Sequence, residues 1–146
     1  MFIRRGQRGD TIVEVLISIA VVSMVLAGAY VTTQRSLIAT RAAQERSNAL
    51  KLGQGQLEQL KGIISSNPNS IFGPGAPTPF CISGGTVVAA TNAGCRVNTN
   101  GAATSVEPIF RLSIARAGNN FTLTETWTNV GGKQTDSLQL RYRAYR

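Results

Sequence analysis

The sequence predicts an α+β protein in which a long N-terminal α-helix, membrane-spanning in its first half, packs against a C-terminal antiparallel β-sheet of three or more strands. Three observations support this fold class: an apolar run near the N-terminus, a stretch of helix-forming residues without proline after it, and alternating apolar and polar residues in the last third. The chain has 146 residues, which suits one compact domain with an attached element.

Composition excludes most classes of enzyme and metalloprotein. The chain has 15 Lys and Arg residues against 7 Asp and Glu, and it has no His. It therefore has no His-dependent triad or His-ligated metal, and its two Cys cannot hold a four-thiolate zinc site or an iron–sulfur cluster. Asp10 and Glu14 border the apolar run, and the other carboxylates show no spacing that suggests a catalytic cleft. We predict no enzymatic activity, no metal site and no cofactor.

The apolar run is long enough to cross a membrane. Residues 15–31 contain no charge, and extending the run back to Ile12 adds only Glu14. About 20 apolar residues in a helix span a hydrocarbon core of roughly 30 Å. The alternative is a buried helix of a large soluble domain, but the remaining chain is too small to surround it. We therefore predict a membrane, or an equally apolar assembly, around this segment.

The segment before the apolar run is short and basic, with three Arg and no acid in MFIRRGQRG. An ordinary secretory signal has its cleavage site after the apolar stretch. Here Gly9 stands before it, followed by the sequence DTIVEVL, in which Asp10 is first and Glu14 fifth. This combination resembles the class III signal of type IV pilins and type II secretion pseudopilins.

The resemblance implies specific roles for these residues. A prepilin peptidase would cut after Gly9 at the cytoplasmic face of the membrane and methylate the new amine of Asp10. Glu14, the fifth mature residue, would pair with the N-terminal amine of a neighbouring subunit during assembly. Asp10 departs from the Phe or Met of most members, and its carboxylate lies one helical turn from Glu14, where the two charges repel.

The chemistry of Glu14 fits this role. A charged carboxylate inside a bilayer costs a few kcal/mol, so it needs a partner or a proton. Cleavage after Gly9 creates an amine at Asp10, about 6 Å of helix rise away. The alternative is a Glu14 that stays hydrated at the level of the lipid headgroups.

The resemblance also implies a function, partners and a location. We expect a pilin-like structural subunit of a type IV pilus or related filament, and the missing mid-segment Pro favours a minor one. Its partners would be other pilin subunits, the prepilin peptidase, the pilus assembly machinery and, before assembly, the membrane. It would cross the cytoplasmic membrane once, with its C-terminus outside, and end in an extracellular pilus. The alternatives are a pseudopilin of a type II secretion system and a signal-anchored surface binding module, either an adhesin or a DNA-uptake protein.

We divide the chain into five segments: a leader (1–9), a transmembrane and polymerisation helix (10–35), an amphipathic stalk helix (36–66), a variable loop region rich in Gly, Pro and Asn (67–106) and a β-meander (107–146). Asn67 and Pro68 should end the helix, because a residue before Pro avoids helical backbone angles. Two glycines, Gly53 and Gly55, predict a soft spot in the stalk helix.

The stalk helix has an apolar stripe that should pack under the C-terminal sheet. Leu50, Leu57 and Ile64 recur every seven residues, with Ala43 one step earlier and Leu60 on a neighbouring track. The alternative is that this stripe binds a partner protein.

In residues 67–106, 23 of 40 residues are Gly, Pro, Asn, Ser or Thr, which predicts loops with short strands at most, for example near 86–90. Cys81 and Cys95 lie in this segment. If it is exported, an oxidising compartment permits a disulfide that closes a 15-residue loop, and the alternative is two reduced Cys.

The β-meander follows from alternation in three stretches. Phe110, Leu112 and Ile114 share one face, Thr occupies every second position from 122 to 128, and apolar residues alternate again from Leu138 to Tyr142. Turn sequences separate these stretches at 117–120 and 130–133. The sheet needs a cover for its apolar face, and the stalk helix is available.

A basic patch lies near the C-terminus. It comprises Arg141, Arg143 and Arg146, with Arg111 and Arg116 predicted on the same sheet. Such a patch can bind DNA phosphates or an acidic cell surface. It can equally be a solvated face or a contact with an acidic neighbouring subunit.

Overall fold

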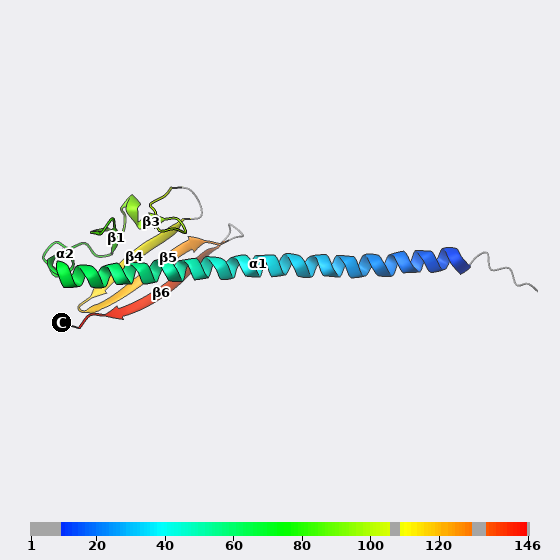
Figure 1. Ribbon diagram of the computed structural model, residues 1–146, viewed down its shortest axis with the longest axis horizontal. Helices are drawn as coiled ribbons and strands as arrows, with labels where there is room; N and C mark the ends of the chain where they lie inside the picture. Colours follow the sequence, from blue (N-terminus) through cyan, green and yellow to red (C-terminus); the bar gives the residue numbers. More distant parts are fainter. Residues whose placement is uncertain (1–9, 106–108, 130–133, 146) are drawn as a thin grey trace, which may run out of the picture. The chain divides into compact units, whose positions relative to one another are not determined.

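The structure is a computed structural model that describes residues 10–105, 109–129 and 134–145. Its helices are α1 (Asp10–Ser66), α2 (Asn69–Phe72) and the 3₁₀ turn η1 (Ala93–Cys95). Its strands are β1 (Phe80–Ser83), β2 (Thr86–Ala89), β3 (Arg96–Val97), β4 (Phe110–Ala117), β5 (Asn120–Thr128) and β6 (Thr135–Arg143) (Figure 1). The predicted α+β class, a long helix with an antiparallel sheet, is confirmed.

The chain divides into two compact units between Thr40 and Arg41. The described part of the N-terminal unit is the first stretch of α1. Hydroxyl groups in this stretch donate to main-chain carbonyls one turn back, for example from Ser18 to Glu14 and from Thr32 to Gly28. The helix therefore satisfies these polar side chains internally, as a segment in apolar surroundings requires.

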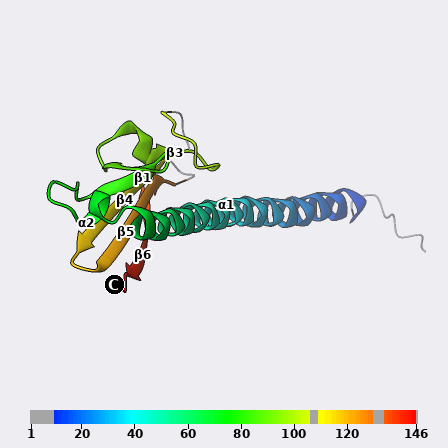
Figure 2. The same cartoon turned by 60° about the vertical axis from the view of Figure 1, so that its left-hand side comes forward.

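The C-terminal unit contains the rest of α1 and an antiparallel sheet of six described strands. Five of them run in the order β2-β1-β4-β5-β6, and β3 pairs with β4 beside β1 (Figures 1 and 2). The last three strands form a meander in which Leu112 lies opposite Glu125 and Glu125 opposite Leu138. Gly118 has a φ of +61° in the β4–β5 turn, a conformation that favours glycine.

The core of this unit lies between α1 and one face of the sheet. Leu60 of α1 packs with Phe80, Ile114 and Phe121 from three strands, and all four side chains are fully or almost fully buried. Around Ala49 a second cluster includes the aromatic rings of Phe110 and Trp127, and the two Cys. The three strands predicted from alternation thus have their apolar faces where the pattern indicated.

The predicted stripe on the stalk helix is only partly right. The positions that α1 buries completely or nearly so are Ala49, Gly53, Gln56 and Leu60, spaced at one helical turn. Leu50 is 39% exposed and Ala43 is exposed, so their assignment to the contact face is wrong. Leu57 and Ile64 are half-buried and flank the true stripe. The heptad of large residues misled the prediction because small residues let this helix approach the sheet.

Gly53 is the closest point of that approach. A Cβ atom added there would lie 2.8 Å from Leu140 Cδ1, 3.1 Å from Leu123 Cδ2 and 3.3 Å from a Glu125 carboxylate oxygen. Helix α1 runs unbroken through Gly53 and Gly55, and the soft spot expected there stays a prediction. Gly55, by contrast, has open space at the position of a Cβ.

The segment from 67 onward contains the short elements α2, β1, β2, η1 and β3 between its loops. Helix α1 ends at Ser66, directly before Asn67 and Pro68. Strand β2 lies where a short strand was predicted. Arg116 does not join the basic patch, because its guanidinium lies 5.3 Å from the ring centroid of Phe72 on the α2 side.

Candidate functional site

The apolar surface of α1 in the N-terminal unit is uncovered. Its large hydrophobic side chains are about half to three-quarters exposed, from Leu37 at 49% to Met24 at 76%. The helix is long and apolar enough to cross a membrane. Its most apolar stretch has a mean hydropathy of 2.4, and the described residues bury none of that stretch. Exposed apolar surface of this extent requires lipid or another protein around it.

The residues assigned to processing and assembly lie at the start of this helix. Asp10 is the first residue of α1, while Gly9 and the basic leader lie outside the described residues. Glu14 lies in the second turn and is exposed. Its main-chain carbonyl accepts a hydrogen bond from Ser18 Oγ at 2.7 Å, and its carboxylate makes no ion pair with a described residue. That carboxylate is therefore available to a partner from outside the chain.

Comparison with known protein families agrees with this geometry. A family model described as the prokaryotic N-terminal methylation motif matches residues 4–30, which include the leader's last residues, Gly9, Glu14 and most of the apolar run. The chain carries the class III signal peptide of type IV pilins and pseudopilins. Searches among curated proteins and among solved structures give no match. The pilin-type signal points to a structural subunit rather than an enzyme, and with the apolar helix it supports membrane anchoring.

The two Cys form a disulfide in the C-terminal unit. The Sγ atoms of Cys81 and Cys95 are 2.06 Å apart, and the Cα atoms are 5.7 Å apart. The bond joins β1 to η1, and both side chains are buried against the second core cluster. Of the two alternatives that the sequence left open, the structure contains the disulfide.

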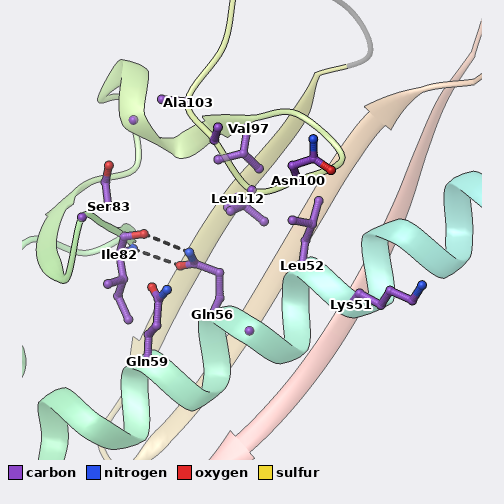
Figure 3. A pocket seen from close by; sticks show the side chains of 15 residues that line it. Lys51, Leu52, Gln56, Gln59, Ile82, Ser83, Val97, Asn100, Ala103 and Leu112 are labelled. Carbon is purple, nitrogen blue, oxygen red and sulfur yellow. Dashed lines mark hydrogen bonds between the residues drawn. The ribbon is translucent and has the colours of Figure 1, made fainter.

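A polar cleft of about 470 Å³ lies beside the middle of this unit's helix, and Ser83, Val97 and Asn100 are among the residues that border it on the other side (Figure 3). At its edge Gln56 Nε2 donates to the carbonyl of Ile82 at 2.9 Å, and the Ile82 N–H donates to Gln56 Oε1 at 3.0 Å. The side-chain amide of the buried Gln56 thus forms two hydrogen bonds with the main chain of β1, as the main chain of a neighbouring strand would. Lys51, Gln59 and Asn100 also line the cleft, which is open to solvent.

The predicted basic patch is partly assembled. Arg141 and Arg143 share the solvent-exposed face of β6, and Arg111 is exposed on β4. Arg146 lies outside the described residues.

Sequence reasoning missed the environment of Glu125. Its side chain is completely buried, and neither carboxylate oxygen has a hydrogen-bond partner among the described residues. This burial raises the pKa of Glu125 to about 8. The alternation of β5 held the signal, because Phe121, Leu123 and Trp127 share the buried face at the same two-residue spacing.

Proposed function

We propose that this protein is a structural subunit, and a minor one, of a type IV pilus or related filament.

 In this role the prepilin peptidase cuts the chain after Gly9, the new amine of Asp10 is methylated, and the mature subunit assembles through residues 10–35 of α1. The pilin-type signal at residues 4–30 carries the proposal. The uncovered apolar helix directly behind it supports the proposal, because such a helix is stable only in lipid or among similar helices.

Glu14 is the residue that we assign to assembly. Its carboxylate has no ion pair with a described residue, and a charge in apolar surroundings needs a partner. Cleavage after Gly9 supplies an amine at Asp10, and the amine of one subunit can pair with Glu14 of the next. The carboxylate of Asp10, one helical turn from Glu14 in the sequence, repels the Glu14 carboxylate and works against this pairing.

The proposed location follows from the same features. We propose a single pass through the cytoplasmic membrane with residues 36–145 outside, followed by transfer to an extracellular pilus. The disulfide between Cys81 and Cys95 supports export of this part, because disulfides persist in oxidising compartments. The partners are then other pilin subunits, the prepilin peptidase and the assembly machinery.

A pseudopilin of a type II secretion system is the second candidate, because the same signal occurs in both families. Both candidates are structural and need neither a metal nor a cofactor. In both, residues 36–66 would serve as the stalk and 67–146 as the exposed part of the subunit.

Mass spectrometry of the N-terminus tests the proposal. We expect the native protein to begin at Asp10, with an added methyl group, and to be recovered from sheared surface fibres. The Gly9→Ala variant should keep its leader and stay in the membrane. A native product that begins at Met1 and sediments as single molecules would contradict the proposal and favour a signal-anchored binding module.

A pair of charge variants tests the role of Glu14. Glu14→Gln should still be cut after Gly9 but enter fibres poorly. Glu58→Gln is the matched control, because Glu58 is exposed and pairs only with Lys61, at 2.7 Å, among the described residues. Equal incorporation of both variants into fibres would remove the pairing argument and leave the cleavage argument intact.

A further inference from the structure

Strand β6 forms one edge of the sheet, since among the described strands it pairs only with β5 (Figure 1). It is nine residues long, and its register with β5 continues without a bulge from Thr135 to Arg143. It contains neither Pro nor Lys, with which proteins often protect such an edge, and its inner side, toward α1, carries one charge, Asp136. The edge is therefore open to pairing along most of its length.

The hydrogen bonds at both ends of β6 show which of its main-chain groups face this open edge. At one end the Asn129 N–H donates to the Gln134 carbonyl at 3.0 Å. At the other end the Ala144 N–H donates to the Asn119 carbonyl at 2.9 Å. Bonded and non-bonded positions alternate in an antiparallel pair, so the even-numbered residues of β6 bond to β5. The N–H and carbonyl groups that face the open edge are therefore those of residues 135, 137, 139, 141 and 143.

One side of α1 faces β6. Arg46 borders a hollow of about 440 Å³ together with Asp136 and Ser137 from the start of the strand. Near the other end of the strand, Lys61 Nζ lies 5.6 Å from the ring centroid of Tyr142. Arg46 and Lys61 therefore mark the two ends of a helix side that runs along β6.

Between these two cations, the corner formed by α1 and β6 is apolar and incompletely covered. Leu50 and Leu57 lie on this side of the helix, because they follow Arg46 by four and eleven residues. Leu50 is 39% exposed, and Leu57 is half-buried. Leu138 and Leu140 on the inner side of β6 are also half-buried. A further strand paired with β6 would place every second side chain in this corner and cover these leucines.

The outer side of β6, which faces away from α1, is cationic toward the end of the strand. Arg141 and Arg143 share this side, and neither makes an ion pair with a described residue, although the Arg143 guanidinium lies 5.8 Å from the ring centroid of Tyr145. A residue directly opposite either arginine on a further strand would carry its side chain on the same outer side. Opposite charges at such positions stabilise pairing, and like charges destabilise it. The edge therefore suits a strand with Asp or Glu at these two positions.

A second copy of this chain matches the edge less well. If two β6 strands paired antiparallel over their full length, each Arg143 would lie opposite a Thr135. Each Arg141 would lie opposite a Ser137, so neither arginine would meet an acid. The second copy would also bring its own cations to the edge. Charge complementarity therefore favours a different, acidic strand.

We propose that the open edge of β6 binds an extended acidic segment of a partner protein, which adds to the sheet as an antiparallel strand. The main chain of the segment bonds to the odd-numbered residues of β6. Its apolar side chains fill the corner beside Leu50, and its acids face Arg141 and Arg143. Strand addition of this kind takes affinity from main-chain hydrogen bonds and specificity from alternate side chains. The binding is a property of single subunits and does not depend on filament assembly.

The test is fluorescence anisotropy of a labelled synthetic peptide with the full-length chain in detergent. The peptide is as long as β6, is blocked at both ends and alternates Val and Ile with Thr and Glu, so that two Glu can lie opposite Arg141 and Arg143. Methylation of the Thr and Glu main-chain nitrogens removes the N–H groups that face β6 and should weaken binding at least about tenfold. Methylation of the Val and Ile nitrogens alters N–H groups that face away, and should change binding by less than about twofold.

Two proline variants locate the binding on the protein. Gln139→Pro removes an N–H that faces the open edge, leaves the bonds between β5 and β6 in place, and should weaken binding at least about tenfold. Ala89→Pro is the matched control and should not weaken it. The Ala90 N–H donates to the Pro79 carbonyl, so even-numbered residues of β2 bond to β1 and the Ala89 N–H faces the opposite edge of the sheet. Near-UV circular dichroism and Trp127 fluorescence check that each variant is folded.

An exchange of charges tests the chemistry of the partner. The variant Arg141→Glu/Arg143→Glu should weaken binding of the acidic peptide by about fivefold or more, because two attractive pairs become repulsive. A peptide with Lys in place of each Glu should bind this variant more tightly than it binds the wild type.

Four results would overturn the proposal. The first is equal binding of the two methylated peptides, and the second is an equal loss in Gln139→Pro and Ala89→Pro. The third is wild-type protein that binds the Lys peptide as tightly as the Glu peptide. The fourth is a peptide with the sequence of residues 135–143 that binds as tightly as the acidic one, which would assign the edge to a second copy of this chain.

Discussion

Helix α1 has two regions with the same backbone and opposite surfaces. In the N-terminal unit its apolar side chains are exposed, as for Leu26 at 64%, whereas in the C-terminal unit one stripe is sealed, as for Leu60 at 0%. The first region is rich in Ile and Val, which favour helices less than the Ala, Gln and Leu of the second. Both regions are helical all the same, so helix propensity does not explain why the surface of one is exposed and that of the other is packed.

The distribution of apolar residues separates them. The first region is apolar all round, which is typical of a helix in lipid or in a helical assembly. The second is apolar on one side only, and one face of a sheet is enough to cover it. The chain's own sheet buries the apolar stripe of the second region, whereas the apolar surface of the first region needs lipid or other helices around it.

The largest expected effect comes from the same substitution made in each region. Leu60→Ala should lower the free energy of unfolding of the C-terminal unit by about 4 kcal/mol, because it leaves a cavity in a closed core. Leu26→Ala should leave that unfolding unchanged, because Leu26 contributes no buried surface to it. Thermal unfolding in detergent, followed by Trp127 fluorescence, measures both. Equal losses from both variants would mean that the two regions unfold as one.

The disulfide should have the next largest effect, confined to the C-terminal unit. A variant with both Cys81 and Cys95 replaced by Ala opens a 15-residue loop and should lose about 3 kcal/mol of unfolding free energy. Wild-type protein treated with a reductant provides the matched measurement. Helical content from residues 10–40 should persist in far-UV circular dichroism, and its loss would show coupling between the regions.

Glu125 should make the stability of the C-terminal unit depend on pH. Its pKa is raised to about 8 by burial, from 4.5. Between these values the folded state keeps the proton that the unfolded state releases, so stability falls as pH rises from about 4.5 to about 8 and levels off above it. We expect the wild type to lose about 2 kcal/mol or more across this range. Glu125→Gln should match the wild type at pH 4.5 and exceed it at pH 8.

Glu58→Gln is the control for this measurement, because Glu58 is exposed. Parallel stability curves for Glu125→Gln and the wild type from pH 4.5 to pH 8 would show that water reaches the Glu125 carboxylate.

Much of the fold could be predicted because its signals are local. Alternation of apolar residues located β4, β5 and β6, and the Asn67-Pro68 pair located the end of α1 at Ser66. The signal motif of the candidate site could also be predicted, because its residues form one continuous stretch of the sequence.

The contact face of the stalk helix could not be predicted in the same way. The choice between Leu50 and Ala49 depends on how closely the sheet approaches, and that information lies in side chains at least 70 residues away in sequence, such as Leu123 and Leu140. Glu125 was missed because its charge suggested solvent, although its place in the alternation put it inside. Arg116 lies on the predicted sheet, but the alternation of β4 puts it on the face of Phe121, opposite to that of Arg111.

The smallest predicted effect separates two glycines within the second region. Gly53→Ala places a methyl group 2.8 Å from Leu140 Cδ1, and this crowding should outweigh the better helix propensity of Ala, for a net loss of about 1 kcal/mol. Gly55→Ala meets no atom within 4 Å and should gain about 0.5–1 kcal/mol from propensity alone. Thermal unfolding of the two variants measures the difference. If both substitutions stabilise the protein equally, the side chains of Leu140 and Leu123 move aside freely, and the close approach at Gly53 does not determine which face of the helix is buried.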